Sequence, residues 1–180
     1  MNLMSFLKAC PKIILAPLIL IGAAAVSLYL LGLVQDYLRP PEHGPREYAS
    51  IEAAEANLGF RISVPAYFPG YIAWPPARIT GRLLPVPGVE TVYNSPYGAR
   101  IMVISQVASD GGARPDRLPW VKTVLAEDPL KIDGITGVII VARDADGHIL
   151  NGASWNSGSF FYAVITDRSK SELLTIISSM

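Results

Sequence analysis

The stretch Lys131–Ile165 reads KIDGITGVIIVARDADGHILNGASWNSGSFFYAVI, and it decides the fold. Turn residues interrupt it at Asp133-Gly134, at Asp146-Gly147 and at Asn156–Gly158, and the runs between them are rich in β-branched and aromatic residues. Runs of this kind, separated by short turns that contain Gly, Asp and Asn, are typical of antiparallel hairpins. The stretch therefore predicts consecutive strands at Pro129–Ile132, Ile135–Ala142, Ile149–Trp155 and Ser159–Ile165.

The same pattern occurs earlier in the chain. An alternation of period two predicts strands at Arg78–Leu84, Val89–Tyr93 and Ala99–Val107. Proline and glycine mark the turns between these strands and the loop after them. The segment Trp120–Leu125 fits either a helix or a strand.

Helical patterns stand at both ends of this series of strands. Ser50 is a suitable N-cap for a short helix over Ile51–Leu58, which Gly59 ends. Near the C-terminus, Ser169 and Glu172 have the spacing of a capping box before an apolar run. Hairpins in series with helices only at the ends predict an α+β domain, in which an antiparallel sheet is covered on one face.

An apolar run precedes this domain. From Ile13 to Val34 the chain has 22 residues without a charge. As a helix the run is about 33 Å long, enough to cross a hydrocarbon core of about 30 Å. It is longer than the core of a cleaved signal peptide, and Gln35–Leu38 offers no small-residue cleavage site. We expect a cytoplasmic tail over residues 1–12, a single transmembrane helix over residues 13–35, a Pro-rich linker over residues 36–49 and the folded domain over residues 50–180.

Charge predicts the orientation. Lys8 and Lys12 precede the apolar run without any acidic residue, and 13 basic against 15 acidic residues follow it. The positive-inside rule then places the N-terminus in the cytoplasm and the domain outside the cytoplasmic membrane. The domain contains no cysteine, which suits an extracytoplasmic location. Its balanced charge argues against nucleic acid as a partner.

Small residues lie close together in the expected membrane helix. Ala23 and Ser27 form a small-xxx-small pair, and Gly22 stands beside them. Such pairs let two membrane helices approach closely, so these residues are candidates for packing against another membrane protein. Ordinary membrane composition is the alternative explanation.

Residues 60–76, FRISVPAYFPGYIAWPP, combine prolines with aromatic rings. Tyr67, Phe68, Tyr71 and Trp74 are candidates for an exposed partner-binding strip. In the alternative that we favour, the prolines brace an irregular crossover and the rings fill the core between the first helix and the sheet. Alanine at Tyr67 or Phe68 would then cost a few kcal/mol of stability.

Other polar positions offer little chemistry. Arg114 and Arg117 could make the Gly-rich loop Ala108–Pro119 a docking loop. Asp144 and Asp146 resemble the start of a calcium loop, but His148 and Trp155 stand where later ligands are needed, so a hairpin turn is expected. We expect no catalytic, metal or cofactor site, and His148 is best explained as a solvated turn residue.

Several short motifs occur in order along the domain. They are Gly59, Phe60, Val64, Pro65, Pro69, Gly70, Tyr71, Val92-Tyr93, Ile104–Gln106, Ile132–Gly134, Gly137, Trp155, Gly158, Tyr162 and Ser171–Ser179. At these positions the domain resembles a family of bacterial extracytoplasmic domains of unknown function, which one transmembrane helix often anchors or which are attached to anti-sigma-factor-like regulators. The resemblance implies this fold and placement, and it implies scaffold roles for the prolines and rings.

Two functions remain open at this point. The first is a non-enzymatic, membrane-tethered domain that binds a partner protein, as an accessory subunit of a membrane complex or an envelope sensor. The dozen residues before the apolar run are too few to fold into a sigma-factor-binding domain. The second is a carrier of lipid or another small apolar ligand, which requires a large apolar cavity lined by Trp155 and Phe161.

Overall fold

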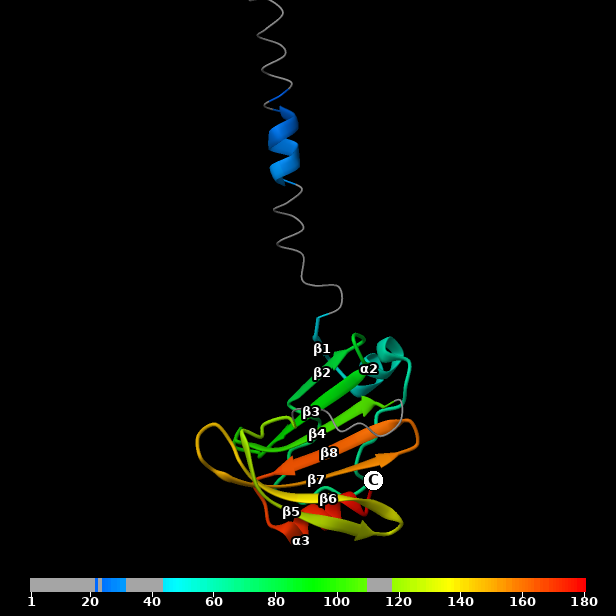
Figure 1. Cartoon of the computed structure of the whole chain (residues 1–180), viewed down its shortest axis with the longest axis vertical. Coiled ribbons are helices and arrows are strands. Elements are labelled where there is room, and N and C mark those ends of the chain that lie inside the picture. Colours follow the sequence, from blue (N-terminus) through cyan, green and yellow to red (C-terminus); the bar gives the residue numbers. More distant parts are fainter. Residues whose placement is uncertain (1–21, 23, 32–43, 110–117) are drawn as a thin grey trace, which may run out of the picture. The chain divides into compact units, whose positions relative to one another are not determined.

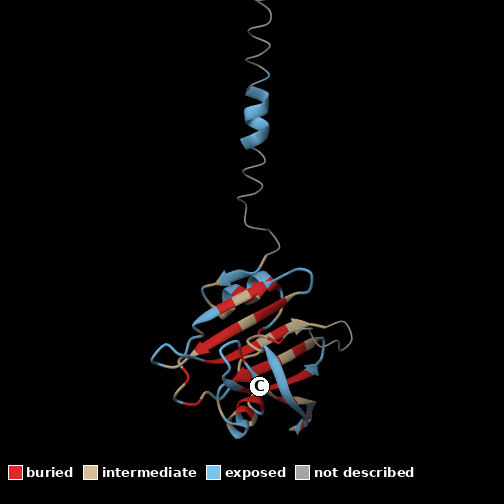
Figure 2. Ribbon diagram, turned by 60° about the vertical axis from the view of Figure 1, so that its left-hand side comes forward, coloured by how far each residue is buried: buried red, intermediate tan, exposed pale blue. Residues whose placement is uncertain are grey.

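The structure is a computed structural model, and it describes residue 22 and residues 24–31, 44–109 and 118–180. The chain consists of two compact units, Met1–Glu42 and His43–Met180. In the first unit, residues 24–31 are helical and their side chains are exposed (Figure 2). Among the described residues, no helix combines the length and hydropathy needed to cross a bilayer. Most of the predicted transmembrane helix over residues 13–35, Ala23 included, lies outside the described residues.

The second unit, which we call the sheet domain, is built on one antiparallel sheet of eight strands (Figure 1). The strand order is β1-β2-β3-β4-β8-β7-β6-β5. Every neighbouring pair is antiparallel, which confirms the predicted α+β class with an antiparallel sheet. The strands are β1 (Arg46–Tyr48), β2 (Arg78–Arg82), β3 (Gly88–Asn94), β4 (Arg100–Ala108), β5 (Thr123–Ile132), β6 (Ile135–Arg143), β7 (Ile149–Ser157) and β8 (Phe160–Thr166).

Two meanders meet at the centre of this sheet. The strands from β1 to β4 and from β5 to β8 each pair in sequence order, and β4 then pairs with β8, so that Ala108 lies opposite Phe160. The turn between β5 and β6 follows the prediction closely: Asp133 and Gly134 both have positive φ, which a two-residue hairpin of matching twist requires.

Two strands differ from the predicted pattern. β5 runs unbroken through Pro129, although proline cannot donate a hydrogen bond to a sheet. Because β5 is an edge strand, this missing donor leaves no neighbour unpaired. The segment Trp120–Leu125, which fitted either a helix or a strand, is strand from Thr123 onward. β1 forms from Arg46–Tyr48, inside the stretch predicted as linker.

Helix α2 (Ile51–Leu58) packs over β1 and β2. The Ser50 side chain accepts a hydrogen bond from the Ala53 N–H, and Gly59 ends the helix with φ +76°, as predicted. A Cβ atom at Gly81 would lie 2.9 Å from Leu58, so the absence of a side chain there lets the helix approach the sheet. This small core contains Ala54, Leu58, Ile62, Ile79 and Val89.

Helix α3 (Lys170–Ile177) lies on the same face of the sheet, over β7 and β8. Its predicted capping box is present, with the Ser169 side chain bonded to the Glu172 N–H and the Glu172 side chain bonded to the Ser169 N–H. The largest hydrophobic cluster joins the helix to the centre of the sheet, and it includes Tyr93, Met102, Ile104, Ile139, Trp155, Val164, Leu173, Ile176 and Ile177.

The opposite face of the sheet is also partly covered, which the sequence did not lead us to expect. Leu118 packs on Ile140, Leu150, Phe161 and Ile165, with Trp120 and Val121 beside it. Leu118, Trp120 and Val121 belong to the segment between β4 and β5. The described part of that segment packs mainly over β6–β8, and Trp120 also stacks on Arg100 of β4 at 4.0 Å. Among the described residues, the β2–β4 half of this face is otherwise open.

Candidate functional site

A groove of about 400 Å³ lies on the open half of this second face. Strands β2, β3 and β4 form its base, and Leu118 and Pro119 stand at one side. Pro45, immediately before β1, also lines it. The groove is lined by Pro45, Arg78, Thr80, Gly81, Arg82, Gly88, Val89, Glu90, Ser105, Val107, Leu118, Pro119 and Phe161.

Strand alternation explains why polar side chains gather there. In β2, Ile79 is buried toward α2, while Arg78, Thr80 and Arg82 point to the other face. Thr80 lies opposite Glu90 of β3, and Glu90 lies opposite Ser105 of β4. The alternation of side chains along the strands therefore lines the groove with polar groups.

The groove combines cations with an apolar floor. Phe161 is buried, and it forms that floor together with Val107, with Leu118 at the side. Arg78 pairs with Glu47 across 3.9 Å, and both side chains are exposed. Arg82 is exposed and has no ion pair within the described residues. An anionic group that has an apolar neighbour would fit these surroundings.

The aromatic residues of the crossover do not form one exposed strip. Tyr67 and Trp74 are 47% and 55% exposed, whereas Phe68 and Tyr71 are partly buried against the main cluster. The Phe68 ring lies 5.3 Å from the Trp74 ring and 5.2 Å from the Tyr93 ring. Phe68 and Tyr71 thus serve the core, while Tyr67 and Trp74 keep surface available for a partner.

The crossover is attached to the C-terminal helix, and this corrects the prediction that these rings fill the gap beside the first helix. The Tyr71 hydroxyl donates to Glu172 Oε1 at 2.7 Å, and the Arg168 guanidinium lies 4.6 Å from the Tyr71 ring centre. The Tyr67 N–H donates to Ser179 Oγ at 3.2 Å. Burial and the Glu172 carboxylate raise the pKa of Tyr71, and the same hydrogen bond, with that from Ser169, lowers the pKa of Glu172. Only the start of the crossover, Phe60–Val64, lies by α2.

Gln106 fixes that start to the sheet. Its buried side chain accepts from the Ser63 N–H at 2.8 Å and donates to the Arg61 carbonyl at 2.9 Å. The first part of the crossover is thus held by β4 and its later part by α3, so the segment is positioned at both ends.

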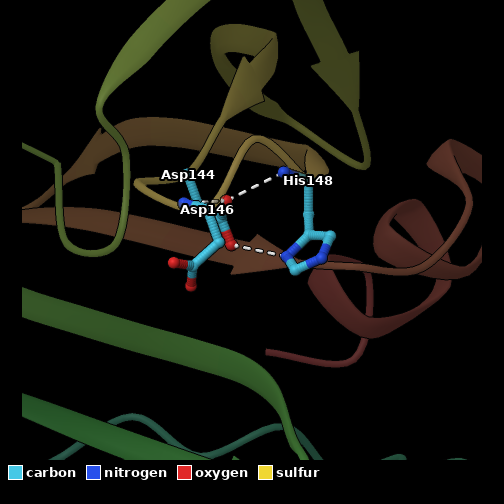
Figure 3. Close-up of side chains that lie close together, drawn as sticks. All are labelled: Asp144, Asp146 and His148. Carbon is cyan, nitrogen blue, oxygen red and sulfur yellow. Dashed lines mark hydrogen bonds and ion pairs between the residues drawn. The ribbon is translucent and has the colours of Figure 1, made fainter.

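Asp144, Asp146 and His148 lie close together in the turn between β6 and β7 (Figure 3). Asp144 Oδ1 accepts from the N–H groups of Asp146 and His148, and Oδ2 lies 3.2 Å from His148 Nδ1. Burial alone would raise the pKa of Asp144, but the hydrogen bonds from His148 and Asp146 outweigh it, and the pKa lies below its ordinary value. The three side chains could offer ligands to a cation, yet both oxygens of the buried Asp144 already hold the turn. The arrangement agrees with the expected hairpin turn.

The ring pair required by the carrier hypothesis is divided between the two faces. Trp155 lies opposite Tyr162 in the β7–β8 ladder and stacks on it at 5.5 Å, on the face that α3 covers. Phe161, the preceding residue of β8, points to the other face and into the groove. One cavity therefore cannot be lined by both rings.

The remaining predicted residues are only partly described. Arg114 and Arg117 lie outside the described residues. Gly22 and Ser27 are exposed in the first unit. The groove itself was missed in the sequence, although the alternation of Arg78, Thr80 and Arg82 with Ile79 and Gly81 signals a strand with one polar face.

Comparison of the chain with models of protein families, with curated proteins and with solved structures finds no match. The resemblance to extracytoplasmic domains therefore stays a prediction, and the groove is interpreted from its own geometry.

Proposed function

We propose that this chain is a non-enzymatic, single-pass membrane protein whose extracytoplasmic sheet domain binds a partner protein through the groove over β2–β4. In this proposal residues 13–35 anchor the chain, the N-terminus is cytoplasmic, and the domain acts as an accessory subunit or an envelope sensor. The observation that carries the proposal is the groove, in which Arg82, which has no ion pair among the described residues, lies beside an apolar floor.

The form of the groove favours a polypeptide over a small molecule. Its lining combines hydroxyl, charged and apolar groups, which a polypeptide segment with both polar and apolar side chains can match. A segment with an acidic residue and an adjacent apolar one would pair with Arg82 and cover Phe161. Charge complementarity of this kind sets specificity and the rate of association.

The β5 edge of the sheet is less suited to partner binding. β5 carries Pro129 and the charged residues Glu127, Asp128 and Lys131, and its register shifts between Val124 and Ala126. Proline, charge and irregular pairing are the features by which natural edge strands avoid pairing with other chains. The carrier alternative is disfavoured because its two expected lining rings face opposite ways.

Site-specific photo-crosslinking in cells tests the proposal. A photoreactive phenylalanine analogue replaces Thr80 in the groove, and the control places it at Tyr97, which is 97% exposed in the turn between β3 and β4. We expect one protein adduct from position 80 and none of that mass from position 97. Adding Arg82→Glu should reduce the adduct by about fivefold or more, because it reverses the charge that the partner meets.

Three results would contradict the proposal. They are an adduct that forms equally at both positions, a yield indifferent to Arg82→Glu, and crosslinking to lipid alone. The last of these would favour the carrier.

A further inference from the structure

The turn between β2 and β3 exposes an unusual set of side chains. Leu83, Leu84 and Val86 are 40%, 49% and 38% exposed, and two prolines separate or follow them. We call this segment, Leu83–Pro87, the apolar turn. None of its three large side chains belongs to the hydrophobic clusters of the sheet domain.

Folding alone does not require such residues. Turns between strands are ordinarily made of Gly, Asn, Asp, Ser and Pro. A large apolar side chain that stays exposed in a turn adds little to the stability of the fold unless another surface covers it. Elsewhere in the described part of the sheet domain, large exposed apolar side chains occur singly or as the pair Val124-Leu125. A concentrated apolar patch at a loop tip is typical of a surface that contacts another phase or molecule.

The position of the apolar turn indicates what it contacts. The chain enters the sheet domain at Pro45, which lines the groove together with Arg82 and Gly88, the residues that flank the turn. In the ladder, Arg46 lies opposite Gly81 (β1 and β2 are side by side in Figure 1). The apolar turn is therefore at the end of the sheet to which the preceding 42 residues are attached.

Charge at this end complements a phospholipid headgroup. Arg82 directly precedes the turn and is exposed, and Arg78 points to the same face two pleat repeats earlier in the strand. Arginine beside leucines can keep its guanidinium among phosphates while its neighbours enter the acyl boundary. Anionic lipid would strengthen this contact.

We infer that the apolar turn inserts into the interfacial region of the same bilayer that holds the anchor, with Arg82 among the headgroup phosphates while no partner segment occupies the groove. This inference rests on the anchor of the proposed function. The occupant is a phospholipid surface, because the chain enters the sheet domain beside this turn and Arg82 supplies a cation next to its apolar side chains. The contact would hold the groove close to the membrane, where an integral membrane partner could reach it.

Depth-dependent fluorescence quenching tests the inference on the full-length chain. The single native cysteine is removed by Cys10→Ser, and one cysteine is then introduced in turn by Leu84→Cys, Val86→Cys, Tyr97→Cys or Leu28→Cys. Each variant carries an environment-sensitive fluorophore in nanodiscs of phosphatidylcholine and phosphatidylglycerol, with or without brominated acyl chains. All four positions are exposed in the structure, so labelling should leave the fold intact, as circular dichroism verifies.

We expect brominated lipid to quench the labels at positions 28, 84 and 86, and to leave the label at 97 bright. Quenching at 84 and 86 should weaken when phosphatidylglycerol is omitted or when Arg82→Glu is added. Quenching at 28 without quenching at 84 and 86 would overturn this inference and leave the anchor intact. A bright label at 28 would overturn the anchor instead. Equal quenching at 84 and 97 would show nonspecific adsorption and would also overturn the inference.

Discussion

Replacing Phe68 by alanine separates the structural role of the crossover from a binding role. The Phe68 ring packs between Trp74 and Tyr93, with ring centres 5.3 Å and 5.2 Å away. A fully buried phenylalanine costs about 3–5 kcal/mol when it is truncated to alanine. Because Phe68 is only partly buried, we expect a loss of about 2–3 kcal/mol. Tyr67→Ala is the matched control: it removes a ring that is 47% exposed, and we expect a loss of less than about 1 kcal/mol.

Urea unfolding of the full-length chain in a mild detergent, followed by far-ultraviolet circular dichroism, measures both values by linear extrapolation. Phe68→Leu retains much of the buried apolar area and should fall between Phe68→Ala and the wild type. Equal losses for Phe68→Ala and Tyr67→Ala would refute the assignment of the two rings to core and surface. The expectation from sequence, that both substitutions are costly, would then be restored.

Two further perturbations test other contacts. Gly137→Ala should destabilise the domain by more than about 1 kcal/mol, because the new Cβ would lie 2.8 Å from Trp155 Cβ and 3.0 Å from its backbone Cα. Gly70→Ala is the control: its Cβ meets no atom within 4 Å, so stability in the same assay should change by less than about 0.5 kcal/mol. Glu172→Gln should reduce stability at pH 7 and lose this effect as the pH falls below 4.5 and through the lowered pKa of Glu172, which urea titrations across that range would measure. The sign follows because the Tyr71 hydroxyl lowers the pKa of Glu172 from 4.5, so the ionised form stabilises the fold above that value and protonation removes the benefit.

Contrary outcomes of these two tests are equally specific. Equal effects of the two glycine substitutions would mean that the β6–β7 approach is looser than the structure describes. A Glu172→Gln difference that is constant with pH would mean that the carboxylate acts only through its shape.

The strands could largely be predicted from sequence because their signals are local. Asp133-Gly134 supplies two residues that tolerate positive φ, and the runs on either side alternate or are continuously apolar, so the hairpin is encoded within a dozen positions. The caps at Ser50 and Ser169 are local in the same sense.

What could not be predicted depends on distant partners. The exposure of Tyr67 and the partial burial of its neighbour Phe68 are decided by Tyr93 and α3, which are far away in the sequence. The groove exists because β2–β4 lie beside Leu118 on one face of the sheet, and strand order is invisible to a local pattern. Pro129 suggested a strand boundary and became harmless only because β5 is at an edge.

The junction of the two meanders has a consequence for biosynthesis. β4 pairs with β3 on one side and with β8 on the other. The backbone hydrogen-bonding groups of β4 that face β8 therefore stay unpaired while the chain from residue 108 to residue 160 is made. At about 5–20 residues per second this delay lasts roughly 3–10 s. During that interval the nascent N-terminal half carries an unsatisfied, apolar ladder, the kind of surface that chaperones recognise. A chain truncated before Phe160 should therefore bind holdases in the compartment where the domain folds, and the full-length chain should be released from them.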